Sequence, residues 1–424
     1  MKQKILLLFV SLVTIFQGCK ETVEEIHSAG LWMPSLSAER GDKMVTLKWD
    51  SPGFYLRMYP PPDYAEPDEV DIYISHSLLS DFQLYKTIDG SIHSCLIDGL
   101  ENSKAYYFYV ETRKKGYETR VSSKVMVVPS TPEQPELIKS IDKSTLGLGD
   151  IKNDFTEIAY TNWNFAWNGG SNCCISSAVM LYSSISGSNT VIDTFSFYGN
   201  WHPSKNQLLY VTDKGEIAVE GHRPSHFVIY DMEFGTFNHY PDGKNEIRFP
   251  VFTNDGERII YIKNPPDSGF EIWQMEVEAG EREQLVMHDP FSDNSLLDPD
   301  KPVLSPDDSD LYFEAAGGTA HGGHLAIWRY NFQDKTIDRV IESLWDDTNP
   351  AVSPNGEMLA FISDRSGNQN IWVYNFLSGK YIQVTGSESF SCRKGLGLLH
   401  WEDNNTIVFC GQTKNMEGII RVGF

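Results

Sequence analysis

Two histidines three residues apart are the first feature of the sequence whose type and spacing could support chemistry. His321 and His324 lie in the glycine-rich segment 317–324. Neutral imidazole is a common ligand of transition metals, so the pair predicts a candidate metal site. Four glycines make the segment costly to order, and no acidic residue stands beside the histidines in the sequence. The metal is therefore an alternative, and the main expectation is a chain without a cofactor.

A second group of candidate residues combines aromatic rings with carboxylates and amides. An aromatic ring stacks on the apolar face of a sugar, while Asp and Asn exchange hydrogen bonds with its hydroxyls. Arginines could instead pair with a uronate or a peptide carboxylate. The candidates for this ligand-binding site are Trp345, Asp346, Asp347, Asn349, Phe291, Phe390, Arg365 and Arg393. They predict glycan binding with Trp345 as the principal contact, and turn capping is the alternative for Asp347 and Asn349.

A serine hydrolase is the catalytic class that the sequence argues against. Its nucleophile stands in a Gly-x-Ser-x-Gly pentapeptide between a strand and a helix. The sequence contains no such pentapeptide. Three functions remain as expectations: glycan binding without catalysis, a protein–protein scaffold at the outer membrane, and a metal-dependent polysaccharide lyase built on His321 and His324.

The segments that must position these residues are copies of one repeat. One motif returns about every 50 residues in the second half of the chain. It consists of an apolar residue, then Ser/Thr, Pro/Asn, Asp/Asn and Gly/Asp, and then a run that ends in an aromatic residue. The clearest copies begin at Pro250, Pro302 and Pro350, and looser copies begin at Trp201 and His400. A period of this length predicts a repeat architecture.

Each copy predicts a small antiparallel sheet. An Ile-Trp strand follows the first hairpin at 272–273, 327–328 and 371–372, and a polar turn and a short last strand follow it. Short strands rich in β-branched and aromatic residues, joined by Gly, Asn and Asp turns, are typical of a four-stranded meander. Such a sheet cannot bury both faces alone, so we expect the copies to pack radially as propeller blades, with the three tryptophans between blades.

The copy from Asp346 to Thr385 resembles the TolB-type propeller repeat. Its turn 353–356, Ser-Pro-Asn-Gly, has Asn where the family usually has Asp, and its loop 363–367, Ser-Asp-Arg-Ser-Gly, matches the next loop of the family. The resemblance implies an all-β propeller of roughly six blades over residues 151–424. It is nearly silent about function, because such propellers serve as scaffolds, as ligand-binding proteins and as partners of peptidase domains.

The last copy predicts how the ring closes. Its second strand is expected at 406–409 and its third at 418–424, with no residues after them for a fourth. An unpaired edge at that place would be an aggregation hazard. The expected donor of the fourth strand is Phe155–Tyr160, ahead of a first blade at about 163–197. The fold is therefore predicted to be a propeller closed by an N-terminal strand.

The N-terminal residues predict the compartment. Residues 1–18 carry lysines at positions 2 and 4 and then an apolar run that is too short to remain as a membrane span. With Gly18 directly before Cys19, the segment resembles a bacterial lipoprotein signal peptide, in which Cys19 is acylated. Residues 19–30 resemble the acidic tether of surface-exported lipoproteins of the Bacteroidetes type. The resemblance implies a lipid-anchored protein of the outer membrane, exposed at the cell surface.

The charge of the chain argues against two classes of partner. The net charge is −23, and loss of residues 1–18 would make it more negative, because these residues carry two lysines and no acidic residue. Such a surface repels nucleic acid and anionic lipid head groups. The expected partners are a glycan or a protein, and the expected membrane contact is the lipid anchor alone.

Residues 31–129 predict a second, smaller β unit. Strands are expected at 45–49, 71–75 and 105–110. Leu100 stands six residues before Tyr106, the spacing of a tyrosine corner, in which the phenol hydroxyl bonds back to the turn backbone. The unit resembles a fibronectin type III sandwich with a Pro-rich insertion at 51–69. We expect it to act as a spacer, joined to the propeller by a semi-rigid linker at 130–150.

Overall fold

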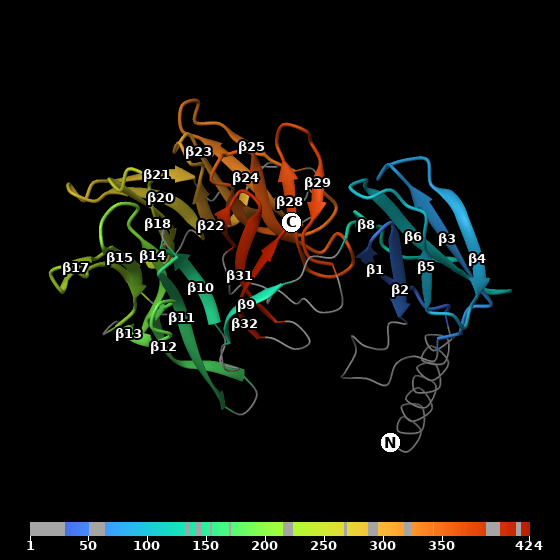
Figure 1. The fold of residues 1–424 in the computed structure, drawn as a ribbon, viewed down its shortest axis with the longest axis horizontal. Helices are drawn as coiled ribbons and strands as arrows, with labels where there is room; N and C mark the ends of the chain where they lie inside the picture. Colours follow the sequence, from blue (N-terminus) through green and yellow to red (C-terminus); the bar gives the residue numbers. More distant parts are fainter. Residues whose placement is uncertain are drawn as a thin grey trace, which may run out of the picture. The chain divides into compact units, whose positions relative to one another are not determined.

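The computed structural model describes residues 30–50, 64–131, 135–140, 146–152, 155–168, 171–214, 224–266, 269–286, 296–317, 324–341, 343–386, 399–412 and 417–424 (Figure 1). The predicted signal peptide, Cys19 and most of the predicted tether lie outside these ranges. Every regular element within them is a β-strand, and none of them contains a helix long and apolar enough to cross a membrane. The chain divides into two compact units at Val127 and Val128, except that Arg40–Asp42 group with the second unit.

The first unit consists of two antiparallel sheets that enclose one core. The smaller sheet has the order β1 (Ser35–Gly41), β2 (Met44–Asp50), β5 (Ser94–Ile97). The larger has the order β4 (Gln83–Asp89), β3 (Glu69–Ser75), β6 (Tyr106–Arg113), β7 (Arg120–Val121), and β8 (Val125–Val127) also pairs with β6. Trp49, Val70 and Phe108 from the two sheets meet in the core, because alternate residues of each strand face inward.

The predicted tyrosine corner of this unit is confirmed. Tyr106 is buried, and its phenol oxygen accepts a hydrogen bond from the backbone N–H of Glu101 at 3.0 Å. The phenol oxygen thereby gives the backbone N–H of Glu101, in the turn, a hydrogen-bond partner. Most of the predicted insertion, residues 51–63, lies outside the described structure.

The second unit is a six-bladed propeller of four-stranded antiparallel sheets. Blade 1 contains β10 (Leu146–Ile151), β11 (Glu157–Asn168), β12 (Ser171–Ser183) and β13 (Asn189–Thr194). Blade 2 contains β14 (Ser196–Trp201), β15 (Gln207–Thr212), β16 (His226–Asp231) and β17 (Thr236–Tyr240). Blade 3 contains β18 (Glu246–Phe252), β19 (Arg258–Asn264), β20 (Glu271–Glu276) and β21 (Arg282–Val286).

The remaining blades complete the ring. Blade 4 contains β22 (Leu296–Leu304), β23 (Asp310–Gly317), β24 (Leu325–Asn331) and β25 (Ile337–Arg339). Blade 5 contains β26 (Asp347–Val352), β27 (Met358–Ser363), β28 (Asn370–Asn375) and β29 (Tyr381–Gln383). Blade 6 contains β30 (His400–Asp403), β31 (Thr406–Gln412), β32 (Glu417–Gly423) and β9 (Glu136–Ser140). First strands of consecutive blades are neighbours, and β10 contacts β31 of the last blade, so the ring is closed (Figure 1).

The strand that closes the ring is not the predicted one. Residues 136–140, which lie within the predicted linker, form β9 and pair with β32, with Leu137 opposite Ile420. The predicted donor Phe155–Tyr160 contributes instead to β11, the second strand of blade 1. That blade spans 146–194 and not 163–197. The linker prediction at 130–150 is wrong because Leu137 and Ile138 pack against two different apolar clusters, so this short run is a half-buried strand.

A β-bulge recurs in the first strands of blades 2 to 5 and explains where the sequence motif begins. At each bulge two residues of the first strand oppose one residue of the second. The bulged pairs are Tyr198–Gly199, Phe249–Pro250, Lys301–Pro302 and Asn349–Pro350, and the first member of each has a positive φ. Bulges bend a strand and redirect its side chains, so the motif prolines mark the bend of the first strand in blades 3 to 5, and Gly199 lies at this place in blade 2.

The Ile-Trp strands contribute the expected packing between blades. Trp328 of blade 4 lies in one apolar cluster with Ile260 and Ile272 of blade 3. Trp273 packs against a cluster formed by blades 2 and 3, and Trp372 is fully buried. Burial of these large rings stabilises the contact of neighbouring sheets.

Candidate functional site

Two of the predicted ligand contacts, Asp347 and Arg365, form an ion pair inside blade 5. Arg365 Nη2 lies 2.6 Å from Asp347 Oδ1, and the side chains are 1% and 0% exposed. The guanidinium carbon also lies 4.7 Å from the ring centres of Phe361 and Tyr381. A surface ligand would not touch either side chain. The prediction that they contact a ligand is therefore a poor fit to this structure, because aromatic rings cover them.

Asn349 links blades 4 and 5 and is buried as well. Its side-chain oxygen accepts a hydrogen bond from Lys301 Nζ at 2.8 Å, and its N–H donates to Glu314 Oε2 at 2.7 Å. Lys301 and Glu314 form a buried ion pair at 2.8 Å. The polar groups of this cluster satisfy one another, which is the condition for burying them without a large penalty. Asn349 thus joins two blades, which neither of its predicted roles included.

Trp345, Asp346 and His324 remain accessible at the start of β26. Trp345 and Asp346 are half-buried, and the His324 side chain is 46% exposed. Asp346 Oδ1 accepts a hydrogen bond from the N–H of Leu325 at 3.0 Å and lies 3.5 Å from His324 Nδ1. The structure thus supplies an acidic neighbour that the local sequence around His324 lacked.

The remaining predicted site residues lie outside the described structure. These residues are Phe291, Phe390, Arg393 and His321. Among the residues that the structure describes, no group of three His, Cys, Asp or Glu side chains is arranged to hold a metal. The metal site at His321 and His324 therefore stays a prediction.

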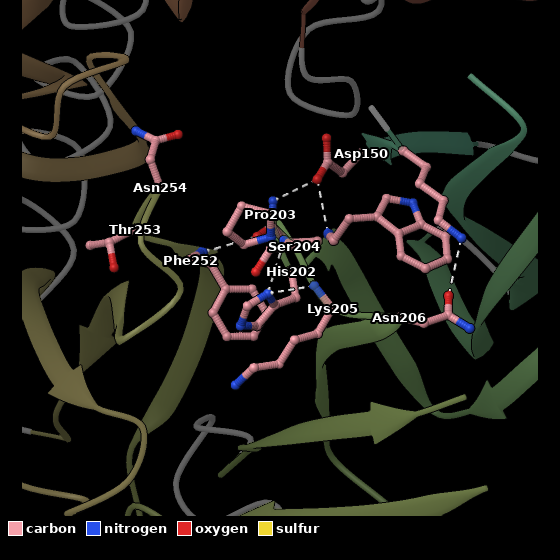
Figure 2. Close-up of a pocket in the computed structure, with 12 residues that line it drawn as sticks. Asp150, His202, Pro203, Ser204, Lys205, Asn206, Phe252, Thr253 and Asn254 are labelled. Carbon is pink, nitrogen blue, oxygen red and sulfur yellow. Dashed lines mark hydrogen bonds between the residues drawn. The ribbon is translucent and has the colours of Figure 1, made fainter. Parts of the chain in front are cut away.

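A cavity lies at the other end of the first strands, where β14 and β18 end (Figure 2). Its volume is about 430 Å³. Asp150 and Lys152 of blade 1, residues 200–206 of blade 2 and residues 252–254 of blade 3 line it. Sequence reasoning missed this site because we placed ligand binding on the face that carries Trp345.

The cavity borders a turn that departs from the other repeats. The first turn residue is Thr253 in blade 3, Ser305 in blade 4 and Ser353 in blade 5. In each blade its hydroxyl accepts a hydrogen bond from the N–H of the residue five positions later. In blade 2 this position is His202. Its Nδ1 accepts hydrogen bonds from the N–H groups of Ser204 at 3.2 Å and Lys205 at 3.1 Å. The imidazole must be unprotonated at Nδ1 to accept them.

A hydrogen bond between first turns joins blades 3 and 4 but not blades 2 and 3. Asn254 of blade 3 donates from its N–H and from Nδ2 to the carboxylate of Asp308 in blade 4, at 2.9 and 2.7 Å. The equivalent residues between blades 2 and 3 are Pro203, which has no N–H, and Gly256, which has no carboxylate, and blades 4 and 5 have the same pair of residue types. The ring of His202 packs on Gly256 instead, where an added Cβ would lie 2.3 Å from the imidazole. The cavity lies beside His202.

Hydrogen bonds between first strands hold the cavity walls together. Asp150 Oδ2 accepts from Asn200 Nδ2 and from the N–H of Trp201, both at 2.9 Å. Asn200 Oδ1 accepts from the N–H of Phe252 at 3.0 Å. His400 of blade 6 lies 3.4 Å from Asp150 Oδ1. Figure 2 shows Asp150 and Asn254 on opposite sides of His202. The walls are therefore preorganised by three successive blades and braced by a fourth.

Two lysines line the cavity and differ in what they contact. Lys152 Nζ is 2.9 Å from Glu157 Oε2 and donates to Asn206 Oδ1 at 3.0 Å. Lys205 is exposed, and its ammonium has no hydrogen bond or ion pair with any residue in the described ranges. Burial and the nearby charge of Lys205 both lower the pKa of His202. The site can thus offer the exposed ammonium of Lys205 to a polar ligand, although Asp231 lies within reach of the same charge.

Comparison with known proteins gives distant similarities. No family model matches the chain. An uncharacterized protein of Agrobacterium fabrum is 28% identical over 123 residues, which are 29% of this chain and 33% of that protein. The matched part is thus about a third of the length of that relative, and it gives no indication of an activity.

Similar solved structures include three with different functions. TolB from Acinetobacter baumannii has a TM-score of 0.45 and 12% identity, with 76% of this chain and 77% of TolB covered. An oligogalacturonate lyase in complex with manganese has a TM-score of 0.49 and 9% identity, with 93% and 98% covered. An auxiliary nutrient binding protein from Bacteroides thetaiotaomicron has a TM-score of 0.46 and 10% identity, with 93% and 97% covered. These likenesses are too weak to choose among functions.

Proposed function

We propose that the chain is a lipid-anchored surface protein that binds a glycan in the propeller cavity without catalysis. The observation that carries this proposal is the cavity of about 430 Å³ between the turns of blades 1, 2 and 3. Its volume lies within the range of small-ligand sites, roughly 300–1,000 Å³. The walls are held by hydrogen bonds between blades, so little ordering is required when a ligand binds.

The groups around the cavity suit a ligand rich in hydroxyls. Ser204, Lys205 and Asn206 are exposed polar residues of one turn, and Trp201 and Phe252, whose side chains are largely buried, also line the cavity. A sugar presents hydroxyls to such polar groups and apolar C–H faces to the rings. This arrangement moves the proposed glycan site from Trp345 to the turn 202–206.

Residues 1–18 and Cys19 supply the proposed anchor. Their resemblance to a lipoprotein signal supports acylation of Cys19 and residence at the outer membrane, with the first unit as a fibronectin type III-like spacer. Metabolic labelling with palmitate tests the anchor in the full chain. Label is expected on the wild type and absent after Cys19→Ser, and a labelled Cys19→Ser protein would contradict it.

A glycan array probed with soluble chain tests the binding site. Ser204→Tyr places a large ring at the cavity edge and is expected to abolish binding. Ser378→Tyr, at an exposed turn of blade 5, is the matched control and is expected to leave binding unchanged. Trp345→Ala is expected to leave it unchanged as well, because Trp345 lies at the opposite end of the first strands. Loss only with Trp345→Ala would return the site to the face predicted from sequence.

A protein partner is the second candidate function, and one observation favours it. Large apolar side chains of blades 1 and 2 are strongly exposed, including Ile185 at 81% and Phe234 at 74%. Exposed apolar surface often marks protein contacts. Crosslinking of the anchored protein in cells would reveal a partner, and we expect Phe234→Ser to remove it. Absence of glycan binding together with such a partner would favour the scaffold.

A further inference from the structure

We infer that the cavity binds an acidic sugar, whose carboxylate is held by the turn 203–206 through Lys205. This inference rests on the proposed glycan site and adds the class of sugar. In blades 3, 4 and 5 the equivalent turn already contains a carboxylate or an amide of the chain itself.

The equivalent turns show what this backbone accepts. In blade 3, Asp255 Oδ1 accepts the N–H of Glu257 at 2.9 Å. In blade 4, Asp307 Oδ1 accepts the N–H of Ser309 at 3.1 Å. In blade 5, Asn355 Oδ1 accepts the N–H of Glu357 at 3.1 Å. An oxygen two residues into the turn thus satisfies the N–H two residues later in all three blades.

Blade 2 lacks this internal acceptor. Ser204 occupies the position of the carboxylate, and the N–H of Asn206 makes no hydrogen bond to any residue that the structure describes. Asn206 is exposed, so the N–H faces solvent or a ligand. A carboxylate from outside the chain can therefore accept the bond that Asp255 and Asp307 accept in their own turns.

The charge of the turn is also inverted relative to its equivalents. Lys205 stands where blades 3, 4 and 5 have Gly256, Asp308 and Gly356. Asn206 stands where blades 3 and 5 have Glu257 and Glu357. Blade 2 has therefore lost acidic groups and gained a cation, within a chain whose net charge is −23. The ammonium of Lys205 attracts an anionic group at that place.

Asp150 also lines the cavity, but its negative charge does not argue against a carboxylate ligand. Asp150 Oδ2 accepts two N–H donors, from Asn200 and Trp201, and Oδ1 lies beside His400. Its charge is therefore directed into the contacts between blades. Lys152 adds positive charge to the same wall, although Glu157 pairs with it.

Titration with monosaccharides tests the inference without an oligosaccharide. Glucuronate and glucose are added at equal ionic strength to isotope-labelled chain, and the amide resonance of Asn206 is followed by NMR. We expect glucuronate to bind about tenfold tighter than glucose, because a charge-assisted hydrogen bond is stronger than a neutral one. Sulfate is a third ligand that separates a carboxylate site from a general anion site.

Three variants make the outcome decisive. Lys205→Gln is expected to remove the preference for glucuronate, and Lys205→Arg is expected to keep it. Lys244→Gln is the control and is expected to leave the preference unchanged, because Lys244 is an exposed lysine in the connection between β17 and β18. Equal affinity of the wild type for both sugars, or no effect of Lys205→Gln, would overturn the inference. Binding of sulfate but not glucuronate would overturn the assignment to a carboxylate.

The same data separate the inference from the proposed function. A neutral glycan that is lost with Ser204→Tyr but not with Lys205→Gln would leave the glycan site standing and refute the acidic sugar. Lys205-dependent glucuronate binding without any oligosaccharide ligand on the array would support the carboxylate subsite and refute glycan capture.

Discussion

Arg365 and Asp347 lie 2.6 Å apart, between Nη2 and Oδ1, in a pair that is closed to solvent. Arg365 comes from the loop after β27, and Asp347 is the first residue of β26. The pair therefore fixes the loop that follows β27 to the first strand of its own blade. Two residues that the sequence predicts as ligand contacts therefore have a structural role.

Removal of one partner of this pair is expected to destabilise the protein strongly. Asp347→Ala leaves a buried guanidinium without its carboxylate, and such losses amount to about 3–5 kcal/mol. Chemical denaturation of the full chain measures the effect. Asp338→Ala is the control, because its pair with Arg329 is exposed at the surface, and we expect a loss below about 1 kcal/mol. Equal effects of the two substitutions would contradict the structural role.

Protonation of His202 is expected to destabilise the propeller in mildly acidic solution. Its pKa is lowered by burial and by the charge of Lys205, whereas the unfolded chain has the ordinary value of about 6.5. Below that value the unfolded state binds a proton that the folded state resists, so stability falls as the pH drops from about 6.5 towards the folded pKa. Above about 6.5 both states are neutral and no stability is lost.

Urea denaturation at a series of pH values measures this dependence. His202→Ser restores the residue type found in blades 4 and 5, and we expect it to reduce the loss of stability below about pH 6.5. His226→Ser, at an exposed pair with His239, is the matched control. An unchanged pH profile in His202→Ser would show that other groups cause the loss.

Closure of the ring is expected to depend on Gly418. An added Cβ at this position would lie 1.9 Å from the carbonyl oxygen of Lys139 in β9. Gly418→Ala must therefore separate β32 from β9, and we expect a loss of about 1–3 kcal/mol, as in other overpacked sites. Gly423→Ala lies on the same strand, where the nearest atom would be 3.8 Å away, and serves as the control. Thermal unfolding that is equal for both variants would argue against closure by β9.

The tyrosine corner is expected to contribute modestly to the first unit. Tyr106→Phe removes the acceptor of the Glu101 N–H while leaving the ring in the core. A single hydrogen bond of this kind contributes about 1 kcal/mol. Hydrogen exchange at the Glu101 amide should accelerate in the variant. Tyr117→Phe, at an exposed site, should have no effect, and unchanged exchange in Tyr106→Phe would refute the contribution.

The fold could be predicted from the sequence because each blade is a local structure. The turn beginning at Ser353 and the strand containing Trp372 are encoded within one repeat, so the pattern of apolar and turn residues was sufficient. Closure was different, because β9 and β32 are nearly the whole propeller apart in sequence. Neither 136–140 nor 155–160 carries a local signal that identifies its partner, so only the tertiary structure distinguishes them.

The candidate site was decided by the tertiary structure for a similar reason. The unusual residues His202 and Lys205 were visible as a loose copy of the motif, but the cavity exists only where that turn meets blades 1 and 3. Conversely, Asp347 and Arg365 are polar in the sequence and buried in the fold. Local composition sets which strands and turns form, whereas the exposure of a polar side chain depends on the neighbours that packing brings to it.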